Sequence, residues 1–390
     1  MIYGSGASFD SGLRYDSLPM DRNFFEHKGV KSIYEHDDLF ALKKFREWFL
    51  PYKNNISLEE LWTAVDLNYK HIVLGTYDWS QENEKYCLDC LNRGNSSYPF
   101  SDLISTAYNS GEPGNLATIE GVPVYNKFKF LGDCNRDLKK LIYSALDVRS
   151  FWGKTNYGEL HKLILEHGNS IVGYITFNYD LVLEKSLKSL DLKPRYLGVN
   201  DNIDSPYFKN SFSGESLILK LHGSLNWENE SGCRDIEFAE DSVRPDYPKS
   251  SLTANSFIEP AIVPPTIFKQ EINDDSRSTD PLTRLLINQW RGARQLLKEA
   301  EKVIIIGYSF PSSDYHAQRI FQISSMVRRN MIKEQKVLVC FGNKLSEEDE
   351  LKKKKNITEI FQIKSESVDI DYKFSNLVTS PKLELFLRQY

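Results

Sequence analysis

Short apolar runs alternate with amphipathic stretches through the second half of the chain. The apolar runs cover residues 171–176, 217–221, 303–306 and 337–341, and each has the length of a buried strand. The stretches at 181–190 and 284–300 carry apolar residues at helical spacing. Strands that alternate with helices in this way predict an α/β fold with a Rossmann-like, doubly wound parallel sheet, whose last strand is the run at 337–341.

The first half of the chain has a different pattern. Between residues 15 and 166, apolar residues recur at helical spacing over 39–49, 58–67 and 136–146, and no strand is expected. Ser57 and Glu60 form a capping-box signature at the start of the second of these helices. The stretch 96–124, rich in Gly, Ser, Asn and Pro, predicts a long loop. We therefore expect residues 15–166 to form an inserted, mainly helical domain, and residues 1–14 and 167–390 to form the Rossmann-like domain.

Polar residues stand at the carboxyl ends of two predicted strands. Thr176-Phe177-Asn178-Tyr179-Asp180 closes the first run, and Lys220-Leu221-His222-Gly223 closes the second. Ligands of an open α/β sheet bind beyond these strand ends. Asn178 and His222 are therefore candidate catalytic residues, because an amide can hold a hydroxyl or a water and an imidazole can take a proton near neutral pH. Either residue alone is more often a turn or loop residue, and Asp180 is as well suited to cap the following helix.

Two glycine turns accompany these strand ends. Gly4-Ser5-Gly6-Ala7-Ser8 follows the short apolar segment Met1-Ile2-Tyr3, and Gly307-Tyr308-Ser309 follows the run at 303–306. Closely spaced glycines after a strand allow the backbone to approach a pyrophosphate, although such a sequence is often only a turn. The predicted dinucleotide contacts are Gly4, Ser5, Gly6, Ala7, Ser8, Thr176, Asp180, Gly307, Tyr308 and Ser309.

Composition narrows the possible partners. The chain has 390 residues, 41% of them hydrophobic, and a net charge of −5, which argues against attraction of the whole surface to nucleic acid or anionic membrane. No apolar run approaches the roughly 20 residues that span a bilayer, and no signal-type segment opens the sequence, so a cytoplasmic protein is expected. Five scattered cysteines include one close pair, Cys87 and Cys90, without a second pair to complete a zinc site. No metal is expected.

The order of the motifs carries a family resemblance. The segments at 4–8, 176–180, 221–224 and 307–309 resemble the motif series of the sirtuin superfamily. Tyr179, the Leu-Asn-Trp at 225–227, the Val-Pro-Pro-Thr at 263–266 and the segment 307–314 resemble bacterial sirtuin-like domains of anti-phage defence systems. The four-cysteine zinc ribbon and the Phe-Gly-Glu and Asp-Phe-Arg segments of deacetylating sirtuins are absent from this sequence.

The resemblance implies an NAD hydrolase that releases nicotinamide and ADP-ribose, with Asn178 and His222 as its catalytic residues and NAD as its substrate. It also implies a role in abortive infection and a HerA-type ring ATPase as partner, through which nucleic acid would act indirectly. A homo-oligomer is expected as well, because the helical insertion offers surface that the nucleotide site does not need. Three alternatives stay open: a catalytically silent sensor that binds NAD or ADP-ribose, an NAD-dependent protein deacylase, and a nucleic-acid-interacting subunit. The last has electrostatic support only in the basic run at 352–355, a pattern typical of a solvated helix end or loop.

Overall fold

A seven-stranded parallel sheet forms the centre of the structure, with strand order β12-β11-β10-β1-β4-β6-β5. The structure is a computed structural model that describes residues 1–11, 18–19, 21–36, 39–49, 56–73, 118–119, 122–146, 154–198, 214–229, 237–238, 259–263, 281–310, 317–322 and 335–388. The strands of the sheet are β1 (Ile2–Tyr3), β4 (Tyr174–Thr176), β5 (Lys193–Arg195), β6 (Glu215–Lys220), β10 (Lys302–Ile306), β11 (Lys336–Phe341) and β12 (Val368–Tyr372). The predicted Rossmann-like parallel sheet is confirmed.

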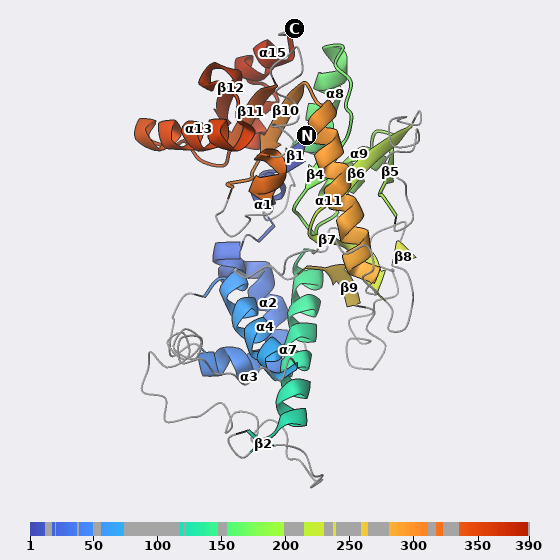
Figure 1. Cartoon of the computed structure of the whole chain (residues 1–390), viewed down its shortest axis with the longest axis vertical. Coiled ribbons are helices and arrows are strands. Elements are labelled where there is room, and N and C mark those ends of the chain that lie inside the picture. The colour runs from blue at the N-terminus through green and yellow to red at the C-terminus, as the bar shows by residue number, and fades with distance from the viewer. Residues whose placement is uncertain are drawn as a thin grey trace.

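Helices cover both faces of the sheet (Figure 1). One face is covered by α11 (Pro281–Glu299), α13 (Glu347–Phe361) and a helical segment at 317–322. The other face is covered by α1 (Ser5–Phe9), α8 (Asn156–Glu166), α9 (Val182–Lys188), α14 (Phe374–Leu377) and α15 (Pro381–Arg388). A short 3-10 helix, η5 (Ser365–Ser367), precedes β12.

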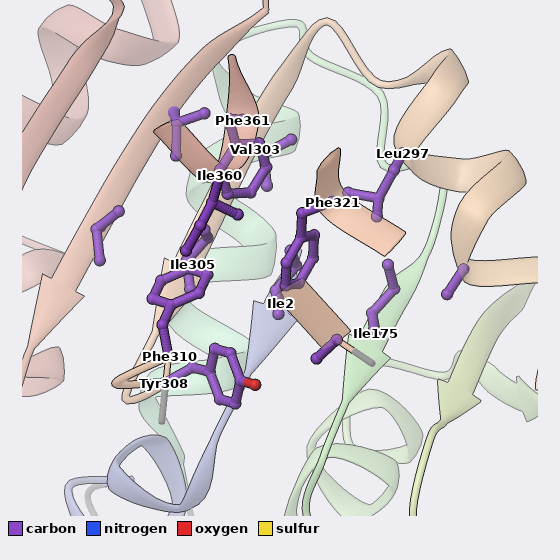
Figure 2. Close-up of a cluster of buried hydrophobic side chains, with 14 of the residues drawn as sticks. Ile2, Ile175, Leu297, Val303, Ile305, Tyr308, Phe310, Phe321, Ile360 and Phe361 are labelled. Atoms are coloured by element: carbon purple, nitrogen blue, oxygen red, sulfur yellow. The ribbon is translucent and has the colours of Figure 1, made fainter. Parts of the chain in front are cut away.

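The alternation of side chains along each strand supplies two separate apolar cores. In β1, Ile2 points into one core and Tyr3 into the other, because successive side chains of a strand leave opposite faces. Figure 2 shows the first core, where Ile2, Ile175 and Ile305 from neighbouring strands lie under the helical side chains Leu297 and Phe321. A strand of two residues is therefore held by burial on both of its faces and by parallel pairing on both of its edges.

A cluster of helices lies at the other end of the molecule (Figure 1). Its elements are η1 (Asp21–Glu26), α2 (Lys28–His36), α3 (Phe40–Phe49), α4 (Leu58–Val73) and α7 (Val124–Ala145). Their shared apolar core contains the fully buried side chains of Phe45, Trp62 and Phe130. The predicted capping box is confirmed: the Ser57 amide donates to Glu60 Oε2 at 3.0 Å, and the Glu60 amide donates to Ser57 Oγ at 3.1 Å.

The predicted division of the chain at residues 15 and 166 stays a prediction. Within that range, α8 packs on the sheet through Tyr157, Leu160 and Ile164 rather than on the helical cluster of η1, α2, α3, α4 and α7. Two short strands, β2 (Thr118–Ile119) and β3 (Val122–Pro123), pair antiparallel there. The expectation that residues 15–166 contain no strand is therefore wrong.

A small antiparallel sheet joins the helical cluster to the large sheet. It consists of β7 (Gly223–Asn229), β8 (Glu237–Phe238) and β9 (Glu259–Ile262), in the order β8-β7-β9. Leu225 of β7 and Ile262 of β9 are buried in the core of the helical cluster. Gly223 begins β7 at φ +86°, and a Cβ there would lie 2.1 Å from the carbonyl oxygen of Ala261, so only glycine fits.

Two edge strands differ from the sequence expectation. The run at 337–341 was expected to be the last strand, but β12 follows it and pairs with it. The segment Val-Asp-Ile-Asp-Tyr of β12 alternates apolar and acidic residues because, at the sheet edge, only part of its surface is buried. The other edge strand, β5, is the segment Lys-Pro-Arg, which has no apolar pattern to detect.

Asp137 in the helical cluster generates a stability prediction. Asp137 is 5% exposed, and its carboxylate accepts a hydrogen bond from the Leu42 amide at 3.1 Å, which links α7 to α3. Burial raises the pKa of Asp137 to about 6, and the hydrogen bond from Leu42 opposes this shift. Since the folded pKa exceeds the unfolded value, near 4, the contribution to stability is fully present below pH 4 and is lost as the pH rises through 6.

The variant Asp137→Asn keeps an acceptor for Leu42 but does not titrate. We expect the unfolding free energy of the variant, relative to wild type, to rise by on the order of 3 kcal/mol between pH 4 and pH 7.5. Urea unfolding of both proteins across this pH range measures the difference. Parallel stability curves for the two proteins would contradict the prediction.

Candidate active site

Four adjacent strands, β10, β1, β4 and β6, end at the same level at one edge of the sheet. The pairing register places Ile306 beside Tyr3, Tyr3 beside Thr176, and Thr176 beside Lys220. Two residues beyond this row stand Tyr308, Ser5, Asn178 and His222. Since neighbouring strands lie about 4.8 Å apart, the backbones of Asn178 and His222 leave the sheet next to each other. The fold thus brings all four predicted motifs to one edge of the sheet: the two polar strand ends and the two glycine turns beside them.

The two glycine turns pack against each other. The Gly4 amide donates to the Ile306 carbonyl at 2.9 Å, and the Gly6 amide donates to the Gly307 carbonyl at 3.1 Å. Gly307 has φ +64°, and a Cβ there would lie 2.1 Å from the Ala7 nitrogen. A Cβ on Gly4 would lie 2.5 Å from the Gly307 carbonyl oxygen. The glycines are required because the main chains of the two turns are in direct contact, which leaves no room for a side chain between them.

This crossing already uses several amides that were predicted to hold a pyrophosphate. The amides of Gly4 and Gly6 donate to Ile306 and Gly307, and the Ala7 amide donates to the Gly4 carbonyl at 2.9 Å. Ser5 is exposed and is the first residue of α1, where an amide has no partner inside its own helix. Among the predicted contacts in this turn, Ser5 is the exposed residue.

Asn178 is held so that its amide presents an acceptor. Its Nδ2 donates to the Gly4 carbonyl at 3.0 Å and to Ser8 Oγ at 2.9 Å, which uses both amide hydrogens. The Asn178 main-chain amide donates to Thr176 Oγ1 at 3.1 Å. Among the described residues, none donates to Asn178 Oδ1. This oxygen is therefore positioned to accept a hydrogen bond from a hydroxyl or a water.

His222 is surrounded by aromatic side chains and is 9% exposed. Its ring centroid is 5.3 Å from that of Phe177, in an edge-to-face arrangement, and 6.4 Å from those of Tyr179 and Trp290. The Val263 amide donates to the His222 carbonyl at 2.8 Å, and Trp290 Nε1 donates to the preceding Leu221 carbonyl at 3.1 Å. The imidazole is thus fixed by its backbone and by three rings.

A second aromatic contact bridges the outer two of three neighbouring strands. The rings of Phe177, after β4, and Tyr308, after β10, stack with centroids 4.2 Å apart and an interplanar angle of 7°. Figure 2 shows Tyr308 at the edge of the apolar core, beside Phe310. Burial raises the pKa of the Tyr308 phenol far above its ordinary value, so this hydroxyl stays neutral. The side chain of Tyr308, a predicted dinucleotide contact, therefore lies mainly in the apolar core next to the site.

Asp180 and Ser8 are buried beneath the site rather than on its surface. Asp180 Oδ1 accepts from the Val182 amide at 3.0 Å, which is the helix-capping role weighed for it from the sequence. Burial raises the pKa of Asp180, while Lys220 and the hydrogen bond from Ser8 oppose the shift. Ser8 Oγ also lies 3.0 Å from the hydroxyl of Tyr157 on α8.

The remaining residues singled out from the sequence are buried, exposed or outside the described part of the chain. Thr176 and Ala7 are buried, and Ser309 is exposed with its carbonyl accepting from Lys353 Nζ at 3.2 Å. The basic run 352–355 lies within α13, where Lys352 pairs with Glu348 of the same helix at 2.7 Å. Cys87 and Cys90, residues 264–266 and residues 311–314 lie outside the described residues.

Sequence reasoning missed three polar residues that support the site. Lys220 and Glu184 form a buried ion pair at 2.9 Å, and Tyr157 contacts Ser8 from α8. A signal for Lys220 was present, since a lysine inside the apolar run Leu-Ile-Leu-Lys-Leu is costly to bury unless it has a partner. Tyr157 carried no such signal, because its place beside Ser8 depends on how α8 packs.

The described part of the chain contains neither a cluster of candidate metal ligands nor a candidate membrane-spanning helix. No group of three His, Cys, Asp or Glu side chains lies close enough there to hold a metal ion. Among the helices that the structure describes, none is both long and apolar enough to cross a membrane.

Part of the chain is similar to a known family of domains. The chain is similar to a crystal structure described as a Sir2 homolog–NAD complex, with 13% identity, a TM-score of 0.36, and coverage of 67% of this chain and 75% of that chain. No curated protein matches the chain. The family model of the SIR2-like domain matches residues 172–360. The region that carries Asn178, His222 and Gly307 is therefore similar to a SIR2-like domain.

Proposed function

We propose that this protein hydrolyses NAD to nicotinamide and ADP-ribose. The observation that carries the proposal is the arrangement of Asn178, whose two amide hydrogens are taken by Gly4 and Ser8, next to His222 on the adjacent strand end. This pair lies within the region that matches the SIR2-like domain family. An oriented acceptor can hold the attacking water, and an imidazole beside it can take the proton that this water releases.

The proposed reaction follows from the properties of the leaving group. The bond between the ribose C1′ and the nicotinamide nitrogen breaks, and the electron pair leaves with nicotinamide, which becomes neutral. No acid is needed for this departure, because the nitrogen carries a positive charge in NAD. The ribose develops positive charge, and the oxygen of a water molecule bonds to C1′. Asn178 Oδ1 accepts a hydrogen bond from this water or from a ribose hydroxyl, and His222 takes the proton that the water releases.

The rest of the dinucleotide would extend from this pair toward the glycine turns. Ser5 lies two residues beyond the common row of strand ends, as Asn178 and His222 do, and it begins α1. The first amides of a helix have no partner inside the helix and can donate to a phosphate. We therefore place the pyrophosphate over Ser5 and the Gly307 turn.

The biological setting is also a proposal. The motif series resembles sirtuin-like domains of anti-phage systems, so we propose that hydrolysis depletes cytoplasmic NAD during infection. We further propose that the chain acts as a homo-oligomer with a HerA-type ring ATPase, which would carry any contact with nucleic acid. Co-purification of the chain with such an ATPase, and NAD consumption with and without it, test this setting.

The proposed catalytic pair gives the first functional prediction. We expect His222→Ala and Asn178→Ala each to lower the rate of NAD hydrolysis by at least about 100-fold, because each removes a group that acts on the water or the ribose. Chromatography of nicotinamide and ADP-ribose measures the rate, with the chain alone and with its ATPase partner. Asn169→Ala is the control, since Asn169 also donates from Nδ2 to a main-chain carbonyl, that of Leu387 at 3.1 Å, at the opposite edge of the sheet.

Three results would contradict this assignment in different ways. NAD that is bound but stays intact would favour the sensor function. Release of nicotinamide only in the presence of an acylated peptide would favour a deacylase. A loss of rate in Asn169→Ala equal to that in Asn178→Ala would show that the effect is general destabilisation.

The pyrophosphate position gives a second functional prediction, at Ser5 rather than at the glycines. A side chain on Gly6 would begin 3.0 Å from the Gly307 Cα, so it would disturb the crossing of the turns whether or not NAD binds there. Ser5→Asp instead places a carboxylate on an exposed residue at a helix start, where it does not destabilise the helix. Repulsion of the pyrophosphate should weaken NAD binding roughly tenfold.

Calorimetry in a His222→Ala background measures this binding without turnover. Ser5→Asn is the neutral control of the same size, and its affinity should stay close to that of Ser5. Equal affinities of Ser5→Asp and Ser5→Asn for NAD would place the pyrophosphate elsewhere.

A further inference from the structure

Lys220 is a fully buried lysine two residues before His222. Its side chain has no exposed surface at the end of β6. Its Nζ donates to the Asp180 carbonyl at 2.6 Å, to Glu184 Oε1 at 2.9 Å and to the Tyr179 carbonyl at 3.3 Å. A lysine ammonium has three hydrogens, so each of them has an acceptor. A buried charge is retained only where it is paired and hydrogen-bonded in this way.

The two carbonyl acceptors belong to the turn that carries Asn178. Tyr179 and Asp180 directly follow Asn178 between β4 and α9. Lys220, in contrast, lies on the strand that carries His222. The ammonium therefore joins the main chain next to one proposed catalytic residue to the strand next to the other.

We propose that Lys220 is a positioning residue that fixes Asn178 relative to His222. This inference rests on the proposed function, since it concerns the rate of the same reaction. Catalytic groups must be held within about 0.5 Å of their productive positions, and residues behind them provide this rigidity. Lys220 acts on this turn together with the small sheet, from which the Leu225 amide donates to the Tyr179 carbonyl at 3.1 Å and the Val263 carbonyl accepts from the Tyr179 hydroxyl at 2.5 Å.

The hydrogen bonds of Lys220 continue to the strand that follows His222. Glu184 Oε1 accepts from the Tyr196 hydroxyl at 3.0 Å, and this hydroxyl accepts from Asn226 Nδ2 at 3.2 Å. Asn226 Oδ1 in turn accepts from the Ser224 hydroxyl at 2.6 Å. Lys220 and Ser224 stand two residues before and two residues after His222. One buried network therefore holds the chain on both sides of the imidazole and also holds the Asn178 turn.

A simpler role for Lys220 has to be separated from positioning. Asp180 and Glu184 are both buried carboxylates, and Lys220 offsets their charge. Within the described part of the chain, Glu184 Oε2 has no hydrogen-bond partner, so this carboxylate depends strongly on Lys220. If charge compensation were the whole role, removal of the Glu184 charge together with that of Lys220 would restore activity. If positioning is the role, the double change restores stability alone, because the bonds to the Tyr179 and Asp180 carbonyls stay lost.

The experiment compares Lys220→Met with the double variant Lys220→Met/Glu184→Gln. Methionine keeps the length of the side chain and removes its donors, and glutamine keeps the shape of Glu184 and its acceptor for Tyr196. We expect Lys220→Met to lower the thermal midpoint and to lower kcat about 100-fold, the effect of a misplacement of about 1 Å. The double variant should recover most of the thermal midpoint while its kcat stays low and its KM for NAD stays within about threefold of wild type.

Lys302→Met is the matched control. Lys302 also lies on a strand of the sheet, at its other end, and its Nζ donates to the Leu387 carbonyl at 2.7 Å and to Asn169 Oδ1 at 3.0 Å. We expect this variant to lose stability and to keep the wild-type kcat. A kcat loss in Lys302→Met as large as in Lys220→Met would overturn the proposal, and so would wild-type kcat in the double variant.

Crystal structures of the wild type and the double variant test the positioning role independently of NAD hydrolysis. A wild-type chain that leaves NAD intact, alone and with its partner, would contradict the proposed function and not the role of Lys220. Displacement of Asn178 relative to His222 by more than about 0.5 Å in the double variant supports the positioning role. An unchanged distance between the two residues overturns it.

Discussion

The contact between the two glycine turns determines the geometry of the whole site. Gly307 leaves β10 in a left-handed conformation, and its main chain touches Gly6 and Ala7. This contact fixes the direction in which α1 leaves the sheet. The position of α1 in turn places the Gly4 carbonyl and Ser8 Oγ, the two acceptors that orient the Asn178 amide. A larger residue at Gly6 or Gly307 would therefore disturb Asn178 indirectly, through the position of α1.

Next to this crossing, the structure buries three ionisable side chains at the end of the sheet. Lys220, Asp180 and Glu184 are each no more than 6% exposed. Burial of such groups is unfavourable by several kcal/mol for each ion unless partners compensate it, so the fold gains little stability from them. These groups instead fix the positions of the groups they bind, because hydrogen bonds to carbonyls and carboxylates restrict geometry more than apolar contacts do. This accounts for polar residues at positions where leucine would give a more stable core.

The helical cluster and the site share a continuous apolar core. Leu225 lies three residues after His222, and Ile262 pairs with Gly223. Both side chains are buried among the helices of the cluster, and Tyr179 packs against the same group. The hydroxyl of Tyr179 donates to the Val263 carbonyl at 2.5 Å. The residues beside both Asn178 and His222 are therefore supported by the helical cluster as well as by the sheet.

The sequence by itself determined the class of the fold and the candidate catalytic pair. Apolar runs that end in Asn178, His222 and Gly307 are local patterns, and parallel strands must bring their carboxyl ends to one edge. The capping box at Ser57 and Glu60 is equally local. Edge strands such as β5 escaped detection because burial, which creates the apolar pattern, is weakest there.

Only the tertiary structure decided which polar groups meet. That Ser8 orients Asn178, that Tyr157 reaches Ser8 from α8, and that the glycines serve a backbone crossing all depend on residues far apart in the chain. Lys220 was visible as an anomaly in an apolar run, but its acceptors lie 36 to 41 residues away. Hydrogen-bond partners over such separations are chosen by strand order and helix packing, which no local pattern of residues specifies.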